Sequence, residues 1–282
     1  FAIPIAATVN SPYPEARLLF TIMAAVVKNC SSVWGIPTHI ISFIIFKSIP
    51  KYFADGDNGY KFSSISVTGA NQNRTLVVDE KINNLYYLNG SFYYTVNNLL
   101  GDYIEKYSTS NGRRKLTNDA GIDFCYIGGY LYYINVDKLN TAIYGEGIYK
   151  VNASPLSDNN NAGIKVIESD KGLCSLTSDG TDLYYYDMNG YKLVRADTDG
   201  QYISDLLEDF VKPEDPTPTS LGGDLEEYNG LLYYLDIWDE KTLHSYNPQT
   251  KANTRLTANK VDNFSIIGDT IYMNMVTKLV YN

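Results

Sequence analysis

One short phrase recurs along this chain and constrains its fold more than any other feature. The phrase is a two-residue turn, an apolar residue and a pair of aromatic residues. Its copies are Asn89-Gly90 with Phe92-Tyr93-Tyr94, Gly128-Gly129 with Leu131-Tyr132-Tyr133, Asp179-Gly180 with Leu183-Tyr184-Tyr185, Asn229-Gly230 with Leu232-Tyr233-Tyr234, and a weaker Gly268-Asp269 with Ile271-Tyr272-Met273. An earlier copy, Tyr52-Phe53, lacks the turn. An internal repeat of this kind determines the fold class more firmly than local propensity does.

Each copy of the phrase predicts a β-hairpin. A two-residue hairpin turn of type I′ needs positive φ at both central residues, and Asn-Gly, Asp-Gly and Gly-Gly tolerate that conformation best. Side chains alternate along a strand, so the two rings of a pair must point to opposite faces of the sheet. A content of 26 Tyr and 21 Gly in 282 residues agrees with an all-β chain. We therefore expect sheets that are packed against other sheets on both faces.

The spacing of the copies predicts a β-propeller. The first aromatic residues lie at positions 52, 93, 132, 184, 233 and 272, which are 39 to 52 residues apart. A four-stranded propeller blade takes roughly 40–50 residues. We predict four-stranded antiparallel blades in a single domain over residues 1–282, with six blades preferred and seven as the alternative. The last copy leaves room for only three strands, so residues 2–10 are expected to supply the fourth strand and close the ring.

The aromatic strands resemble a known family of repeats. They continue as Tyr52-Phe53-Ala54-Asp55, Tyr132-Tyr133-Ile134-Asn135, Tyr184-Tyr185-Tyr186-Asp187 and Tyr233-Tyr234-Leu235-Asp236. These segments are similar to the Tyr-Trp-Thr-Asp repeats of low-density-lipoprotein-receptor propellers. They resemble still more a family of propeller domains of unknown function in secreted proteins of Firmicutes. The resemblance implies that Asp55, Asp187 and Asp236 are structural acids that hydrogen-bond between neighbouring blades.

The first part of the chain differs from the repeats. Residues 1–48 form an atypical apolar segment, which we interpret as the closing strand and part of a blade. Its apolar runs, 18–27 and 40–46, are shorter than the roughly 18–20 residues that a membrane-spanning helix needs. A net charge of −9 disfavours binding to nucleic acid. We expect no membrane span, no nucleic-acid partner and a monomer.

The chain offers little recognisable catalytic chemistry. Neither of the two His residues, His39 and His244, has a Ser or Cys nucleophile at a familiar spacing. The acidic loop 55–59 has its Gly at the wrong position for an EF-hand. Cys125 and Cys174 lie in expected first strands and are predicted to be small buried apolar groups. We predict no catalytic residue, no metal ligand and no cofactor; calcium is the one alternative, and no motif indicates it.

Several loops could form a binding surface. The loops that join second to third strands all emerge at one face of a propeller, and binding residues concentrate on such loops. In this chain those loops carry acids and aromatic residues, and the candidate binding residues are Trp238, Tyr144, Tyr103 and Asp239. Trp238 is the first of these to test, because Trp is enriched at binding hot spots.

These features favour a non-enzymatic module that binds a protein, a peptide or a cell-wall glycan through one propeller face. We expect it outside the cell or on the surface of a Gram-positive bacterium. One alternative is a propeller enzyme of the lactonase or glycan-cleaving kind, in which acids at the centre hold a cation or act as acid and base. The other is a structural spacer in a larger surface protein. The sequence does not identify the ligand.

Overall fold

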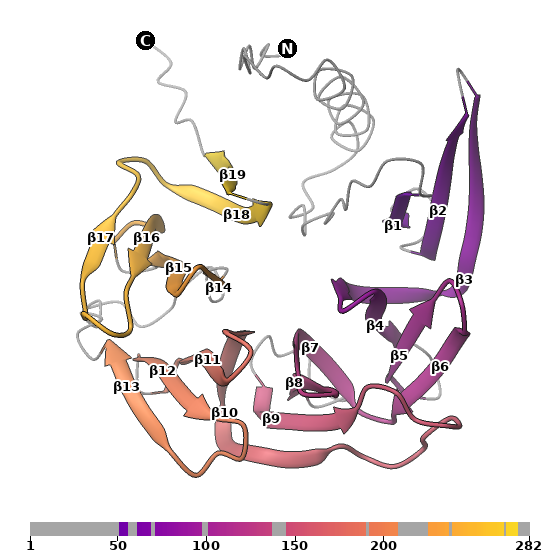
Figure 1. The fold of residues 1–282 in the computed structure, drawn as a ribbon, viewed down its shortest axis with the longest axis horizontal. Coiled ribbons are helices and arrows are strands. Elements are labelled where there is room, and N and C mark those ends of the chain that lie inside the picture. The colour runs from indigo at the N-terminus through magenta and orange to yellow at the C-terminus, as the bar shows by residue number, and fades with distance from the viewer. Residues whose placement is uncertain are drawn as a thin grey trace.

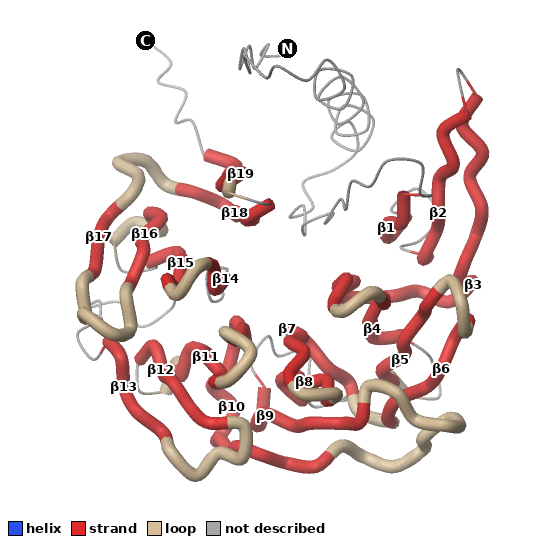
Figure 2. Tube along the Cα trace, in the orientation of Figure 1, coloured by secondary structure: helices blue, strands red, loops and turns tan. Residues whose placement is uncertain are grey.

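The structure is a computed structural model that describes residues 51–55, 61–68, 71–97, 101–136, 145–189, 192–207, 225–236, 239–267 and 269–275. These residues contain β-strands, turns and loops but no helix (Figure 2). No helix that could cross a membrane is therefore found in this part of the chain. The predicted closing strand (2–10), the apolar segment 1–48 and the number of blades in the whole chain lie outside what the described residues can settle.

The strands form antiparallel sheets in chain order. In the first half of the chain the strands are β1 (Lys51–Asp55), β2 (Lys61–Thr68), β3 (Asn71–Leu88), β4 (Ser91–Asn97), β5 (Tyr103–Ser108), β6 (Gly112–Thr117), β7 (Ala120–Ile127), β8 (Tyr130–Val136) and β9 (Gly145–Asn152). In the second half they are β10 (Ile164–Ser178), β11 (Asp182–Asp187), β12 (Lys192–Asp197), β13 (Ile203–Leu207), β14 (Leu225–Tyr228), β15 (Leu231–Asp236), β16 (Thr242–Tyr246), β17 (Asn253–Arg255), β18 (Val261–Ile267) and β19 (Thr270–Met275).

Two long strands each belong to two consecutive repeats. The first part of β3 pairs with β2 and its last part with β4. In the same way, β10 pairs first with β9 and then with β11. The described strands thus divide into six units: unit I (β1, β2, first part of β3), unit II (rest of β3, β4–β6), unit III (β7–β9, first part of β10), unit IV (rest of β10, β11–β13), unit V (β14–β17) and unit VI (β18, β19). Figure 1 shows these units side by side around a common centre, with β6, β13 and β17 at the rim.

The paired aromatic residues fill the spaces between neighbouring units. In unit III, Tyr132 packs in a buried cluster shared with unit IV, whereas Tyr133 packs in one shared with unit II. Tyr93 and Tyr94 of unit II likewise face units III and I. All four rings are at most 3% exposed. The prediction that both faces of the aromatic strand are buried is therefore confirmed in these units, and it places the core between sheets.

The weakest copy of the phrase behaves differently. In unit VI, Tyr272 is 41% exposed and Met273 38% exposed. Both lie on β19, whose described pairing is with β18 alone. Residues 276–282, which were expected to provide the next strand, lie outside the described part of the chain.

Most of the turns have the predicted geometry. Both central residues have positive φ at Asn89-Gly90 (44° and 76°) and at Asn229-Gly230 (53° and 78°), and so do Gly128 and Gly129. The prediction was wrong at Asp179-Gly180. There Ser178 pairs with Leu183, so the loop has four residues, 179–182. The Asp179 carboxylate causes this difference, because its Oδ1 accepts the N–H groups of the two residues that extend the loop, 181 and 182 (2.8 and 2.7 Å).

An unpredicted feature links the innermost strands. Asn84, Asp123 and Ser175 all have positive φ, between 49° and 58°, and each lies at an irregularity in the pairing of the first strand of its unit. The Asp123 carboxylate accepts the hydroxyl of Tyr86 (3.0 Å) and the backbone N–H of Ser175 (2.8 Å). One acid of unit III therefore connects units II and IV, and burial raises its pKa above the ordinary value for Asp.

The predicted repeat acids have described bonds inside their own units. Asp187 accepts the N–H of Asn189 (3.0 Å), and Asp236 accepts that of Asp239 (3.1 Å), so both cap the turn that follows their strand. The side chain of Asp55 lies outside the described residues. Their expected role between blades stays a prediction, whereas Asp123 does connect units.

Candidate functional site

The four predicted binding residues are not assembled by the structure into one described cluster. Trp238 and Tyr144 lie outside the described residues. Tyr103 begins β5 in unit II, is half-buried, and lies under the ammonium group of Lys115 at 4.5 Å from its ring centre. Asp239 lies in unit V, between β15 and β16. Among the described side chains, the surroundings of Asp239 have the geometry of a site.

Hydrogen bonds hold Asp239 to the end of β15 and to the start of β16. The Asp236 carboxylate accepts the Asp239 N–H at 3.1 Å, and the Asp239 carbonyl accepts the Thr242 N–H at 3.0 Å. Between them, Glu240 and Lys241 have φ of 53° and 61°. Two consecutive left-handed residues other than Gly are unfavourable, and such strain persists where the surroundings impose it, often at functional sites. The turn therefore presents Asp239 from a rigid backbone.

Two hydrogen bonds and one ion pair converge on Oδ2 of Asp239. Thr242 Oγ1 donates to it at 2.9 Å and His244 Nε2 at 3.0 Å, and the Arg255 guanidinium forms the ion pair, with Nε 3.2 Å away. The hydrogen bonds from Thr242 and His244 and the positive charge of Arg255 lower the pKa of Asp239 below its ordinary value, so it is ionised at neutral pH. About a third of its side chain, 35%, stays exposed. The sequence did not reveal this cluster, because Arg255 is brought beside His244 only by the pairing of β17 with β16.

His244 is occupied on one side and enclosed on the other. With Asp239 ionised, Nε2 donates its proton to the carboxylate. Nδ1 is buried and has no hydrogen-bond partner among the described residues. The ring also packs against Tyr234, with centroids 5.4 Å apart. This imidazole orients Asp239, and neither ring nitrogen is available to accept a substrate proton, because Nε2 is bonded to Asp239 and Nδ1 is buried.

Metal binding and catalysis by a reactive thiol are poorly supported by the described residues. They contain no group of three or more His, Cys, Asp or Glu side chains placed to hold a metal ion. Cys125 and Cys174 are buried, as predicted. Burial raises the pKa of Cys125 to about 12, which makes it unreactive as a nucleophile at neutral pH.

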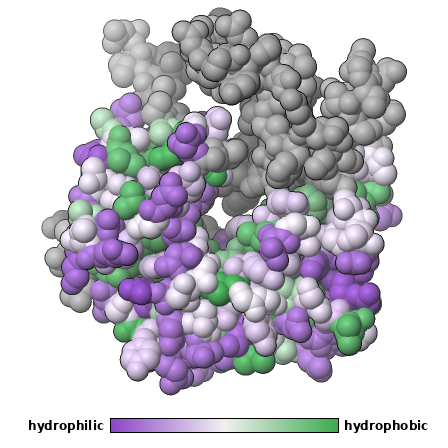
Figure 3. Space-filling model, in the orientation of Figure 1, coloured by the Kyte–Doolittle hydropathy of each residue, from purple (hydrophilic) through white to green (hydrophobic). Residues whose placement is uncertain are grey.

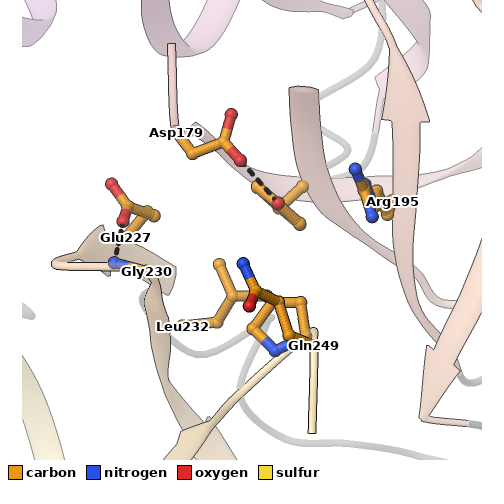
Figure 4. Close-up of a pocket in the computed structure, with 8 residues that line it drawn as sticks. Asp179, Arg195, Glu227, Gly230, Leu232 and Gln249 are labelled. Carbon is orange, nitrogen blue, oxygen red and sulfur yellow. Dashed lines mark hydrogen bonds between the residues drawn. The ribbon is translucent and has the colours of Figure 1, made fainter. Parts of the chain in front are cut away.

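A second candidate site lies between units IV and V. It is a cavity of about 90 Å³, lined by Asp179, Tyr184, Arg195, Glu227, Gly230, Leu232, Pro248 and Gln249. Figure 4 shows Asp179 and Glu227 above Leu232 and Gln249, with Arg195 to one side. The cavity lies where first and second strands, and third and fourth strands, are joined. We call this end of the units the hairpin face, and the opposite end, where Asp239 lies between β15 and β16, the Asp239 face.

The cavity carries an excess of negative charge. Glu227 Oε1 accepts the N–H of Gly230 at 2.7 Å, and Asp179 Oδ2 accepts the hydroxyl of Tyr184 at 2.8 Å. Burial alone would raise the pKa of Asp179, but its hydrogen bonds from the backbone and from Tyr184 lower it below the ordinary value. The guanidinium of Arg195 is paired with Asp182, with 2.8 Å between Nε and Oδ2. The cavity lining thus holds two carboxylates, and its one basic residue, Arg195, is already paired with Asp182.

The described part of the face shown in Figure 3 is mainly hydrophilic. In the view of Figure 3, apolar residues are scattered singly among hydrophilic ones over the described part. Scattered apolar residues are normal for a protein surface. A ligand that binds to this face would therefore contact mainly polar groups.

No protein-family model and no curated protein matches the sequence. Solved structures do match. A nidogen/laminin complex matches with 12% identity and a TM-score of 0.53, over 76% of this chain and 82% of the other. A puromycin hydrolase matches with 11% identity and a TM-score of 0.60, over 80% of this chain but only 40% of its own. Regucalcin, a calcium-binding protein from Agrobacterium tumefaciens, matches with 12% identity and a TM-score of 0.51, over 83% and 80%.

These neighbours differ in function, since one is a complex of two proteins, one a hydrolase and one a calcium-binding protein. Identities this low carry information on fold and none on activity. Together with the repeated antiparallel units around a common centre, they establish that this chain is an all-β protein with the β-propeller fold.

Proposed function

We propose that the protein is a non-enzymatic binding module that recognises a protein, a peptide or a cell-wall glycan through the Asp239 face. The observation that carries this proposal is the ionised, partly exposed Asp239 carboxylate, held by two hydrogen bonds and an ion pair beside two residues of strained backbone. A pre-organised charged group loses little conformational entropy on binding, which favours recognition. Trp238 and Glu240 flank Asp239 in the sequence.

Binding is favoured over catalysis by the state of His244. Its Nε2 is bonded to Asp239, and its Nδ1 is enclosed, so the Asp–His pair is a fixed structural element and not a free acid–base couple. The proposal includes a location outside the cell or at the surface of a Gram-positive bacterium, which rests on the resemblance of the repeats to secreted propellers. A basic ligand suits the net charge of −9 best.

Arrays of basic, acidic and neutral peptides and of cell-wall glycans test the proposal. Asp239→Asn keeps the shape of the side chain and removes its charge. We expect at least a tenfold loss of affinity for the best ligand, because a charge-assisted hydrogen bond contributes about 1.5–3 kcal/mol. Asp269→Asn, in an exposed turn on unit VI, is the matched control and should bind as the unchanged protein does.

Two results would contradict the proposal. One is turnover of any peptide or glycan on the arrays by the purified chain. The other is equal binding by Asp239→Asn and the control. Circular dichroism and a thermal melt of each variant establish that it is folded, so a loss of binding can be assigned to the carboxylate.

A further inference from the structure

Neighbouring units are joined at the hairpin face by a repeated arrangement of side chains. In units II, III and IV, the first Tyr of the second strand lies directly opposite a basic residue of the third strand. The pairs are Tyr93 with Lys106 in unit II, Tyr132 with Lys150 in unit III and Tyr184 with Arg195 in unit IV. The ammonium groups of the two Lys residues lie within 6 Å of the centres of these rings. The basic residue is thus placed at the boundary with the next unit.

In units II and III the Lys crosses that boundary. Lys106 Nζ donates to the carbonyl of Ala153 (2.9 Å) and to Ser154 Oγ (3.2 Å), in the turn that joins the third and fourth strands of unit III. Lys150 Nζ donates to Asp199 Oδ1 (2.8 Å) and to the carbonyl of Thr198 (3.5 Å), in the same turn of unit IV. In both cases an ammonium group bonds to a backbone carbonyl and to the side-chain oxygen of the next residue.

The three turns are equivalent. Each begins with an Asn or Asp whose Oδ1 accepts a backbone N–H a few residues later: Asn152 in unit III, Asp197 in unit IV and Asn247 in unit V. The two acceptors of the ammonium group follow directly after this residue. At the boundary between units IV and V, the equivalent residues are Pro248 and Gln249, and both line the cavity.

No ammonium group of the described chain reaches Pro248 and Gln249. The basic residue at this boundary, Arg195, turns back within unit IV and is held by Asp182, through both Nε and Nη2. The cavity of about 90 Å³ lies in the resulting space. A water molecule needs roughly 10–15 Å³ in this measure, so the cavity has room for a ligand group larger than a single water.

The cavity wall carries a carboxylate at a position where another unit carries a neutral side chain. Counted from the hairpin turn, Glu227 of unit V takes the place that Tyr126 has in unit III. Its Oε1 accepts the N–H of Gly230, and Oε2 has no donor among the described residues. Asp179 supplies a second carboxylate from unit IV, and the charge of Arg195 is balanced by Asp182. A cation entering the cavity would meet a net negative charge.

We propose that this cavity binds a primary ammonium group from outside the chain, such as that of a lysine side chain. In the site the ammonium donates to Glu227 Oε2 and to the Gln249 side chain, close to Asp179. It takes the place that Lys106 and Lys150 fill at the two preceding boundaries. The site lies on the face opposite to Asp239 and is independent of the function proposed above.

A titration followed by ¹H–¹⁵N NMR tests the proposal on the full chain. The probe is Nα-acetyl-lysine methylamide, and the signals to follow are the Gly230 backbone amide and the Gln249 side-chain amide. We expect saturable shifts at both. The Nε-acetylated probe, which carries no charge, should cause none. n-Butylammonium distinguishes the source of the group: equal affinity indicates a site for free amines, and tighter binding of the lysine probe indicates a site for a peptide side chain.

Glu227→Gln should weaken binding at least tenfold, whereas Glu168→Gln, an exposed acid on β10, should not change it. Gln249→Ala is the second variant, because this exposed residue can be truncated without disturbing the core. Equal binding of the charged and acetylated probes would overturn the proposal. So would affinity unchanged by both Glu227→Gln and Gln249→Ala. Asp239→Asn should leave this binding intact, so the two proposals fail or succeed separately.

Discussion

Two neighbouring boundaries, between units III and IV and between units IV and V, share the same backbone pairing. They differ in where the basic side chain at the boundary bonds. At the first, Lys150 crosses to Asp199 and closes the hairpin face. At the second, Arg195 stays in its own unit and a cavity remains. The backbone pairing is equivalent in both, since Lys150 is opposite Tyr132 and Arg195 is opposite Tyr184. The chemistry of a propeller face can therefore change without a change of fold.

The difference can be traced to the residue two positions before the first Tyr of each second strand. In unit III this residue is Tyr130, whose ring lies 5.5 Å from the Lys150 ammonium and leaves it free to bond to the next unit. In unit IV the equivalent residue is Asp182, which binds the guanidinium of Arg195 directly. A planar guanidinium matches a carboxylate well and is held firmly by it. One acid thus converts a closed boundary into an open one.

The largest expected effect concerns the acid that holds units II, III and IV together near the centre. Asp123→Ala removes the acceptor of the Tyr86 hydroxyl and of the Ser175 N–H. Leaving buried donors unsatisfied costs about 1–3 kcal/mol each, so we expect the free energy of unfolding in urea to fall by about 3 kcal/mol. Asp269→Ala, in an exposed turn, should change it by less than about 0.5 kcal/mol. A loss as small as that of the control would show that Asp123 does not hold the units together.

A smaller effect is expected from opening the closed boundary. Lys150→Ala removes a partly exposed ion pair and a stacked side chain, which should lower the free energy of unfolding by about 0.5–1 kcal/mol. Adding n-butylammonium should restore part of this loss by filling the vacated site. Lys165→Ala, which removes an exposed Lys beside Tyr149, is the control and should show no such rescue. If the ligand does not stabilise Lys150→Ala, the two boundaries are not equivalent as receptors for an ammonium group.

The smallest expected effect is the pH dependence of the free energy of unfolding. The pKa of Asp123 is raised by burial, so its contribution to stability is present below about pH 4 and is lost as the pH rises through the folded-state pKa. The pKa of Asp179 is lowered by its hydrogen bonds against the opposing effect of burial. Its contribution is therefore present above about pH 4 and is lost as the pH falls through the folded-state pKa.

Urea unfolding between pH 3 and pH 7 measures both contributions. The difference in stability between the unchanged protein and Asp123→Asn should shrink as the pH rises, and the difference for Asp179→Asn should grow. Slopes of the same sign for the two variants would contradict this contrast. The general repulsion of a chain with net charge −9 affects both variants alike and cancels in the comparison.

Much of the fold was predictable because its causes are local. Alternation along a strand dictates that Tyr132 and Tyr133 face opposite neighbours, and Asn89-Gly90 has the conformational freedom that its turn requires. The four-residue loop at Asp179 was not predicted, because Asp-Gly also suits a two-residue turn. Only the closing hydrogen bonds of the carboxylate decide between the two.

The candidate sites were predictable only in part. Asp239 was expected on a binding face, yet its partner Arg255 is separated from it in sequence and meets it through the pairing of β16 with β17. The cavity between units IV and V was not foreseen at all, because its lining comes from hairpins of two units. No pattern within one repeat reports which residues of two repeats will meet.

The sequence alone establishes that the chain folds into repeated antiparallel units with tyrosine side chains packed between them, because alternation, turn conformation and repeat length act over a few residues. Only the tertiary structure decided where charge would be left unmatched. Whether a basic side chain bonds to its own unit or to the next depends on competing carboxylates that come together when the units pack. As a result of that competition, Arg195 forms an ion pair with Asp182, and a cavity remains beside Glu227.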